Sequence, residues 1–128
     1  MKTTADGLCL DITDYCGRRV IFREVVRQKK LPKRPELRND DFIHGQLTKA
    51  IKEPTYIYED FDRPTERHVY YYEEYTTVNG IKYTEVVIDI AILPFEIVTA
   101  YRPNYIKEEY PNSKAKKIYD KKLAEQKD

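Results

Sequence analysis

The stretch from residue 67 to residue 92 constrains the fold of this chain more than any other. It holds two long runs rich in Val, Ile, Tyr and Thr, over 67–77 and 81–92, separated by Val78-Asn79-Gly80. β-branched and aromatic residues favour strands. Asn-Gly between two such runs is the strongest short-range hairpin signal, because both central residues of a type I′ turn need positive φ. The sequence therefore predicts a long antiparallel hairpin.

Further strands are predicted on both sides of this hairpin. Tyr56-Ile57-Tyr58 forms a short strand before it, and 95–102 forms another after a turn at Leu93-Pro94. Together these runs make a four-stranded antiparallel meander. Nearer the N-terminus, 8–12 is either a strand or a turn, and 19–23 is a strand with a helical turn after it.

The clearest predicted helix spans residues 41–52. Asn39, Asp40 and Asp41 offer an N-cap and negative charge at its start. Apolar residues then recur at helical spacing, and Glu53-Pro54 ends the helix because a residue before proline is pushed out of the α region. Gly45 costs about 1 kcal/mol relative to Ala inside a helix, which predicts a close approach to its backbone.

A second, basic helix is predicted over about 113–126, with Ser113 as its N-cap. Four residues are expected to face inward from this helix: Ala115, Ile118, Tyr119 and Leu123. The overall prediction is an α+β fold: an N-terminal strand and helical segment, helices packed on the four-stranded meander, and a C-terminal helix. We expect one domain over 1–128, with its core at about 8–105.

Composition narrows the class of protein. No apolar run approaches the ~18 residues that a membrane span needs, and the first residues lack the apolar region of a secretory signal. Cys9 and Cys16 fit neither a zinc ribbon nor a disulfide framework, so we expect both to be reduced. These features predict a cytoplasmic protein with no membrane association.

Charge is distributed unevenly along a nearly neutral chain of net charge +1. Residues 18–38 carry nine Lys or Arg and two acids, a net charge of +7, whereas 53–75 carries seven acids and two Arg, a net charge of −5. Clustered cations favour a polyanion, because neutralising phosphates releases counterions. The acidic stretch either orients the molecule on a polyanion, pairs two copies, or cancels charge within the fold. The predicted nucleic-acid-binding residues are Arg19, Arg23, Arg27, Lys29, Lys33 and Arg38.

Seven short segments, in order, are similar to the nuclease-like domains of phages and mobile elements in the barnase–EndoU–colicin–RelE superfamily. The segments are Gly17–Val20, Arg34–Leu37, Ala50–Pro54, Tyr56–Tyr58, Tyr70–Tyr72, Val86-Val87 and Val98–Tyr101. This resemblance covers roughly residues 15–105. It implies helices packed on one face of a four-stranded antiparallel sheet and a metal-independent nuclease activity without a cofactor.

The chain departs from the family pattern at one position. The family usually places a His about four residues before its Arg/His-Pro-Glu-Leu block, and this chain has Lys30 there, with Arg34 inside the block. Either Lys30 or Arg34 serves as an electrostatic substitute, or His44 or His68 supplies the proton from elsewhere, or the domain has lost catalysis.

RNA cleavage without a metal needs a base for the 2′-hydroxyl, an acid for the leaving oxygen, and cations around the phosphorane. No His, Cys or acidic cluster has metal-ligand spacing. Lys30 and Arg34 are expected to stabilise phosphate charge, and Thr99 and Tyr101 to hydrogen-bond phosphate or ribose. Glu36 acts as the base only if its environment raises its pKa.

The same residues also fit plain structural roles. Arg34-Pro35-Glu36 is compatible with a turn whose charges bond a helix end, and His44 with a boundary position on a helix. His68 fits a cross-strand pair, while Thr99 and Tyr101 are ordinary strand residues.

Three functions follow from these observations. The first is a small ribonuclease-like toxin from a phage or mobile element that acts on tRNA or mRNA, with a cognate antitoxin or immunity protein as partner. The second is a catalytically inactive domain of the same fold that binds protein or nucleic acid, for example to inhibit host defence. The third is an accessory protein without nucleic-acid contact.

Overall fold

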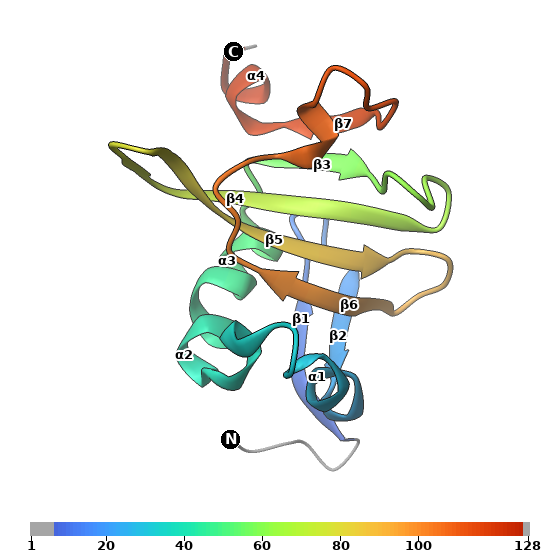
Figure 1. The fold of residues 1–128 in the computed structure, drawn as a ribbon. Coiled ribbons are helices and arrows are strands. Elements are labelled where there is room, and N and C mark those ends of the chain that lie inside the picture. The colour runs from blue at the N-terminus through green and yellow to red at the C-terminus, as the bar shows by residue number, and fades with distance from the viewer. Residues whose placement is uncertain (1–6, 127–128) are drawn as a thin grey trace.

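A seven-stranded mixed sheet organises the molecule (Figure 1). The computed structural model describes residues 7–126, and the order of strands across the sheet is β1-β2-β6-β5-β4-β3-β7. The strands are β1 (Leu8–Thr13), β2 (Arg19–Arg23), β3 (Tyr56–Glu59), β4 (Arg67–Thr77), β5 (Gly80–Asp89), β6 (Phe95–Tyr101) and β7 (Lys117–Asp120). The α+β class predicted from sequence is confirmed, and the predicted meander is the β3-β4-β5-β6 part of a larger sheet.

The long hairpin of β4 and β5 is confirmed, but its turn is not type I′. The two strands pair from Arg67↔Asp89 to Thr77↔Gly80, which leaves Val78 and Asn79 as the loop. Within the described residues only glycines have positive φ, and here it is Gly80, at 118°. The Thr77 hydroxyl closes the loop instead: it donates to the Gly80 carbonyl at 2.9 Å and accepts from the Asn79 N–H at 3.1 Å.

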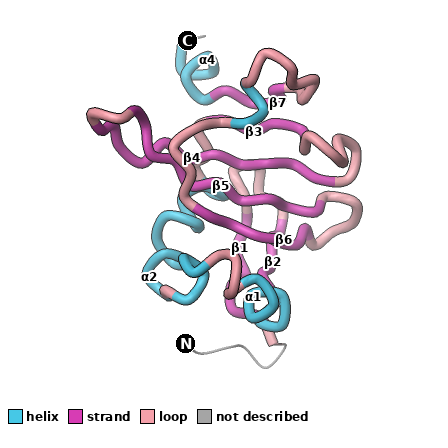
Figure 2. The backbone as a smooth tube through the Cα atoms, in the orientation of Figure 1, coloured by secondary structure: helices cyan, strands magenta, loops and turns pink. Residues whose placement is uncertain are grey.

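The N-terminal hairpin of β1 and β2 joins the sheet through a short parallel contact. β2 pairs with β6 only at Val20↔Phe95 and Ile21↔Glu96. Figures 1 and 2 show β1 and β2 running behind the sheet and across the direction of β4, β5 and β6. The rest of β6 toward Tyr101 therefore has no strand on its outer side.

The predicted helix 41–52 is confirmed as one helical run with a π turn in its middle. It comprises α2 (Asp40–Phe42), η2 (Ile43–Leu47) and α3 (Thr48–Lys52). The Asn39 side chain accepts the backbone N–H groups of Asp41 and Phe42 at 2.8 and 3.4 Å, which is the expected cap.

Gly45 lies in the π turn, and the expectation that something approaches its backbone is wrong. A Cβ at Gly45 would meet no atom within 4 Å. The irregular turn is supported by a different residue, because the Thr48 hydroxyl donates to the Ile43 carbonyl at 2.8 Å. π turns of this kind are rare in globular helices.

The main core lies between the sheet and the helices. Leu37, Ile43, Leu47 and Ile51 are fully buried there against strand residues such as Ile88. Burial of each such side chain stabilises the fold by roughly 1.5–3 kcal/mol. The helical elements before the long helical run are α1 (Glu24–Lys30) and the 3-10 turn η1 (Pro35–Arg38).

A smaller core lies on the opposite face of the sheet. Tyr58, Val69, Tyr71, Val87 and Ile106 form it. The segment that follows β6 crosses this face in front of β5 and β4 (Figure 1), and it contains the 3-10 turn η3 (Lys107–Glu109).

The predicted C-terminal helix over 113–126 is wrong in its first half. Residues Lys117–Asp120 form β7, which pairs with β3, and only Lys121–Gln126 form helix α4. Asp120 caps α4 by accepting the N–H groups of Lys122 and Leu123. The edge of β3 offered unpaired backbone groups, and strand pairing there replaced the helical turns. Of the four residues predicted to face inward, Ile118 and Leu123 are exposed.

Candidate nucleic-acid interface

Arg34 packs face-on against Tyr101 on the last meander strand. Its guanidinium carbon lies 4.3 Å from the centre of the Tyr101 ring, within the range of a cation–π contact. The Arg34 N–H donates to the Lys30 carbonyl at 2.8 Å, which ties the residue to the end of α1. Its Nε is buried and has no hydrogen-bond partner. The structure thus holds a guanidinium with unused donor capacity.

Glu36, which lies in the same 3-10 turn region as Arg34, binds the chain at the end of β6. Its Oε2 accepts the backbone N–H of Arg102 at 3.2 Å. Arg102 in turn forms a two-point ion pair with Glu74, with both N···O distances at 2.9 Å. Because β2 pairs with only the start of β6, η1 can lie beside its other end. The sequence-predicted residues Arg34, Glu36 and Tyr101 are therefore brought together.

Two buried carboxyl groups lie near Tyr101. Glu85, which is 1% exposed, lies opposite Tyr101 in the β5–β6 pairing. The Tyr71 hydroxyl lies 2.7 Å from Glu85 and 2.5 Å from Glu108. One hydroxyl proton cannot be donated to both carboxylates at once, so this arrangement favours the protonated form of one of the two carboxyl groups.

Burial controls the protonation of this cluster. It raises the pKa of Glu85 and of Glu108, and the Tyr71 hydrogen bond opposes the rise in both. Burial also raises the pKa of Tyr101, with the Glu85 charge adding to the effect. Tyr101 therefore stays a neutral hydrogen-bond donor under the guanidinium of Arg34.

Thr99 faces the same side of the sheet as Tyr101, two residues earlier along β6. Its Oγ1 is buried and has no hydrogen-bond partner. Thr99 thus lies on the predicted face as a side chain with an unsatisfied hydroxyl, and it makes no recorded contact with Arg34.

The other cations of residues 18–38 divide into two groups. Arg19 pairs with Asp11 at 2.9 Å and Arg23 with Glu96 at 2.8 Å, both at exposed positions. Among the residues that the structure describes, five members of the stretch form no ion pair: Lys29, Lys30, Lys33, Arg34 and Arg38. These five lie on the segment from α1 to η1, which we call the basic corner.

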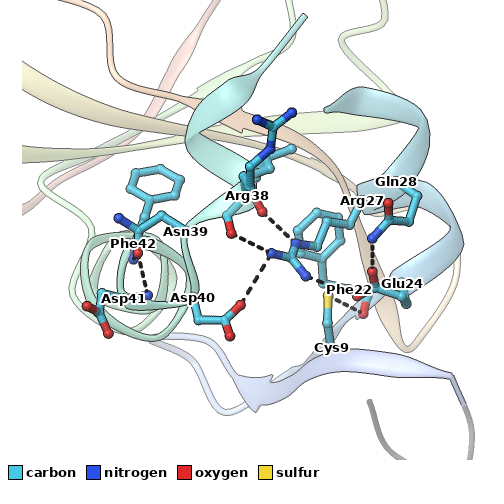
Figure 3. Close-up of polar contacts among 11 residues, drawn as sticks. Cys9, Phe22, Glu24, Arg27, Gln28, Arg38, Asn39, Asp40, Asp41 and Phe42 are labelled. Atoms are coloured by element: carbon cyan, nitrogen blue, oxygen red, sulfur yellow. Dashed lines mark hydrogen bonds and ion pairs between the residues drawn. The ribbon is translucent and has the colours of Figure 1, made fainter. Parts of the chain in front are cut away.

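Arg27 does not belong to the basic corner, although the sequence places it among the nucleic-acid-binding residues. It is 5% exposed, and its guanidinium donates to the carbonyls of Leu37 and Arg38 at 2.5 and 3.1 Å and pairs with Asp40 at 3.3 Å. Figure 3 shows these contacts of the Arg27 guanidinium, with the Arg38 side chain extending away from them. Arg27 thus positions η1, and with it the basic corner, from inside the fold.

His68 lies on the other face of the sheet from Tyr101. Along β4 it shares a face with Tyr70 and Tyr72, which pack on the main core. Burial lowers the pKa of His68, and the neighbouring charge of Arg18 adds to this. His44 is exposed in the π turn. Neither histidine shares a recorded contact with the Arg34–Tyr101 pair.

The acids of residues 53–75 pair within their own part of the fold and with the C-terminal half. Glu66 pairs with Arg63 at 3.5 Å, and Glu73 with Lys122 at 2.9 Å. The Asp60 carboxylate instead accepts the backbone N–H groups of Asp62 and Arg63. Glu74 pairs with Arg102, which follows β6 and donates its backbone N–H to Glu36.

Glu85, Glu108 and Tyr71 were not among the functional residues predicted from the sequence. The available signal was an acid, Glu85, immediately before the apolar run Val86–Ile88 inside a predicted strand. An acid enclosed in a buried strand needs a partner, and here the partner is Tyr71.

The described residues contain neither a metal-binding cluster nor a membrane-spanning helix. Residues 7–126 contain no cluster of three or more His, Cys, Asp or Glu side chains able to hold a metal ion. No helix in this part of the chain is long and apolar enough to cross a membrane.

Comparison with protein-family models, curated proteins and solved structures found no match for this chain.

Proposed function

We propose that this protein binds RNA through its sugar–phosphate backbone, with the basic corner as the phosphate site. The observation that carries this proposal is the Arg34–Tyr101 pair, in which a guanidinium 4.3 Å from an aromatic ring forms no ion pair among the described residues and donates from Nη1 to the Lys33 carbonyl at 3.2 Å. A guanidinium can offer a phosphate two parallel N–H donors. Its stacking on Tyr101 fixes the plane of those donors before a ligand arrives.

Four further cations extend the phosphate site along the surface. Lys29, Lys33 and Arg38 are exposed and Lys30 is half-buried, all without an ion pair among the described residues. Each phosphate contact on a single strand contributes about −0.7 to the slope of log K against log salt. Five cations therefore set an upper bound of about −3.5 for the slope of this protein.

Binding of single-stranded RNA at several salt concentrations tests the proposal. We expect a linear decline in log K, and a shallower slope for a Lys29→Gln/Lys33→Gln variant. Lys52→Gln is the control, because Lys52 is an exposed cation at the end of α3, outside the basic corner. RNA affinity that is absent at low salt, or equally affected by Lys52→Gln, would refute the proposal.

Metal-independent RNA cleavage at the same corner is the second candidate function. Its support is the convergence of Arg34, Glu36 and Tyr101, which supplies a cation, a carboxylate and a hydrogen-bond donor in one place. In this scheme Glu36 takes the proton of the 2′-hydroxyl, whose oxygen attacks phosphorus, while Arg34 and Lys30 stabilise the charge of the phosphorane. The bond from phosphorus to the 5′-oxygen then breaks, and the departing oxygen takes a proton from water.

Incubation of an RNA pool in EDTA separates cleavage from binding. Cleavage predicts 2′,3′-cyclic phosphate products from the wild type and their loss in Glu36→Gln, with RNA affinity preserved. Intact RNA at protein concentrations that saturate binding would exclude the catalytic candidate and leave the binding proposal standing.

A further inference from the structure

A second surface feature lies on the segment that follows β6. Phe61 and Tyr110 are large exposed aromatic side chains, with exposed fractions of 50% and 55%. Both line one cavity of about 310 Å³. The complete lining is Phe61, Asp62, Lys107, Tyr110, Asn112 and Ser113. Exposed aromatic rings around a cavity are costly for a soluble protein unless a ligand covers them.

The lining combines stacking surfaces with hydrogen-bonding groups. Asn112 supplies both a donor and an acceptor. The Ser113 hydroxyl accepts from the Ala115 N–H at 3.1 Å and keeps its own proton to donate. The Asp62 carboxylate accepts from an exocyclic amine, and Lys107 adds one positive charge. Flat rings, neutral edge groups and a single cation match a nucleobase that carries its phosphate.

The segment that carries Lys107 and Tyr110 is anchored to the sheet beneath it. Ile106 is 5% exposed in the smaller core, and the Tyr71 hydroxyl lies 2.5 Å from the buried Glu108 carboxyl group. The Tyr83 N–H donates to the Pro103 carbonyl at 2.9 Å. These anchors fix the segment across the sheet, so stacking a base on it costs little ordering entropy.

The chain that leads from Tyr101 to this cavity carries a second exposed tyrosine, Tyr105. The ring of Tyr110 stacks on that of Tyr105, with centroids 5.6 Å apart and planes 15° apart. Tyr105 follows the end of β6, where the Tyr101 ring lies under Arg34. The segment that carries Tyr105 and Tyr110 leads from β6 across the sheet toward β3 (Figure 1).

We propose that the cavity between Phe61 and Tyr110 binds one unpaired nucleobase of a single-stranded RNA whose backbone lies on the basic corner. This assignment rests on the proposed function and names its substrate class. The volume of about 310 Å³ is at the small end of the ~300–1,000 Å³ typical of ligand pockets, which suits one nucleoside. A duplex is excluded, because its paired and stacked bases cannot reach a ring on a protein surface.

A short single-stranded RNA with one 2-aminopurine, and its counterpart in which that base is abasic, provide the test. We expect quenching of 2-aminopurine fluorescence on binding. Tyr110→Ala should lose the quenching and bind the intact RNA about fivefold or more weakly, whereas Tyr110→Phe keeps both. Phe61→Ala should act like Tyr110→Ala. Tyr75→Ala is the control, since Tyr75 is 53% exposed outside this cavity and its loss should change neither readout.

The abasic RNA separates the two levels of the proposal. It should bind the wild type and Tyr110→Ala equally, because only the backbone contacts remain. If Tyr110→Ala and Phe61→Ala both bind the intact RNA with wild-type affinity and quenching, the base pocket is refuted while backbone binding stands. If the wild type binds neither RNA, the proposed function fails and the base pocket fails with it.

Discussion

Replacement of Tyr71 by Phe tests the buried carboxyl cluster directly. The substitution removes one oxygen from a side chain that is otherwise fully enclosed, and the ring that packs in the smaller core is retained. That oxygen lies 2.7 Å from Glu85 and 2.5 Å from Glu108. Both carboxyl groups already have a second oxygen that is buried without a partner, so neither has a ready substitute for the lost contact.

The expected loss of stability follows from the two hydrogen bonds. A hydrogen bond to a charged group contributes about 1.5–3 kcal/mol, and one between neutral groups about 0.5–1.5 kcal/mol. Removing one of each kind gives a loss of about 2–5 kcal/mol near neutral pH. That is a large part of the ~5–15 kcal/mol by which a domain is stable.

The pH dependence of this loss has a definite sign. Burial raises the pKa values of Glu85 and Glu108 above 4.5, and the Tyr71 hydroxyl restrains the rise. A raised pKa contributes stability that is complete below about pH 4.5 and is lost as pH increases through the folded-state value. Without the hydroxyl both values rise further. The penalty of Tyr71→Phe should therefore grow from about 1–3 kcal/mol near pH 4.5, where the neutral forms predominate, to its full size near neutrality.

Urea unfolding followed by circular dichroism at pH 4.5, 6 and 7.5 measures both effects. Tyr105→Phe is the control, because Tyr105 is exposed and its hydroxyl should contribute less than ~0.5 kcal/mol. A Tyr71→Phe variant as stable as the wild type at pH 7.5, or one whose penalty shrinks with rising pH, would show that the cluster is not a proton-sharing pair of buried carboxyl groups.

Three further predictions use the same unfolding measurement. Arg27→Ala should cost about 3 kcal/mol or more, because it strips donors from buried carbonyls, whereas Arg38→Ala at the exposed neighbouring site should stay within ~0.5 kcal/mol; equal effects would contradict the buried role of Arg27. Asp14 accepts from the Arg18 and Cys16 backbone N–H groups at 2.9 Å each, and these and other hydrogen bonds outweigh burial and lower its pKa below 3.8. Asp14→Asn should therefore destabilise at pH 7, and the difference should fade as pH falls below 3.8; a difference that persists at pH 2 would refute this. Gly45→Ala should stabilise by about 0.5–1 kcal/mol, since no atom lies within 4 Å of the added Cβ; destabilisation would mean that the π turn requires glycine.

Local patterns were sufficient for the elements with strong end signals. The cap at Asn39, the apolar stripe after it and Glu53-Pro54 define the long helical run within one residue of its observed start. The hairpin of β4 and β5 followed from Asn-Gly between two β-rich runs, although the observed loop uses Gly80 in another way. The helix predicted over 113–126 was wrong in its first half because its helical spacing was weak. In addition, β3 had an unpaired edge, and no local pattern reveals such an edge.

The candidate site was also predictable only in part from the sequence. The concentration of cations at 18–38 is a property of sequence alone, and it indicated a polyanion site. Which of those cations remain available was decided by folding: Arg27 is buried in η1 contacts, whereas Arg34 reaches Tyr101 past the unpaired end of β6. Exposed and buried charges look identical in a sequence, because burial depends on partners distant along the chain.

The amino-acid order by itself determined the long helical run and the four meander strands, because propensity, capping and turn chemistry act between residues close in sequence. Only the tertiary structure decided that β2 joins β6, that two acids share the Tyr71 hydroxyl, and that Tyr105 and Tyr110 stack beside a cavity. Those arrangements depend on contacts between segments that are distant in sequence. Such contacts form, and contribute their free energy, only when the whole sheet and its two cores assemble.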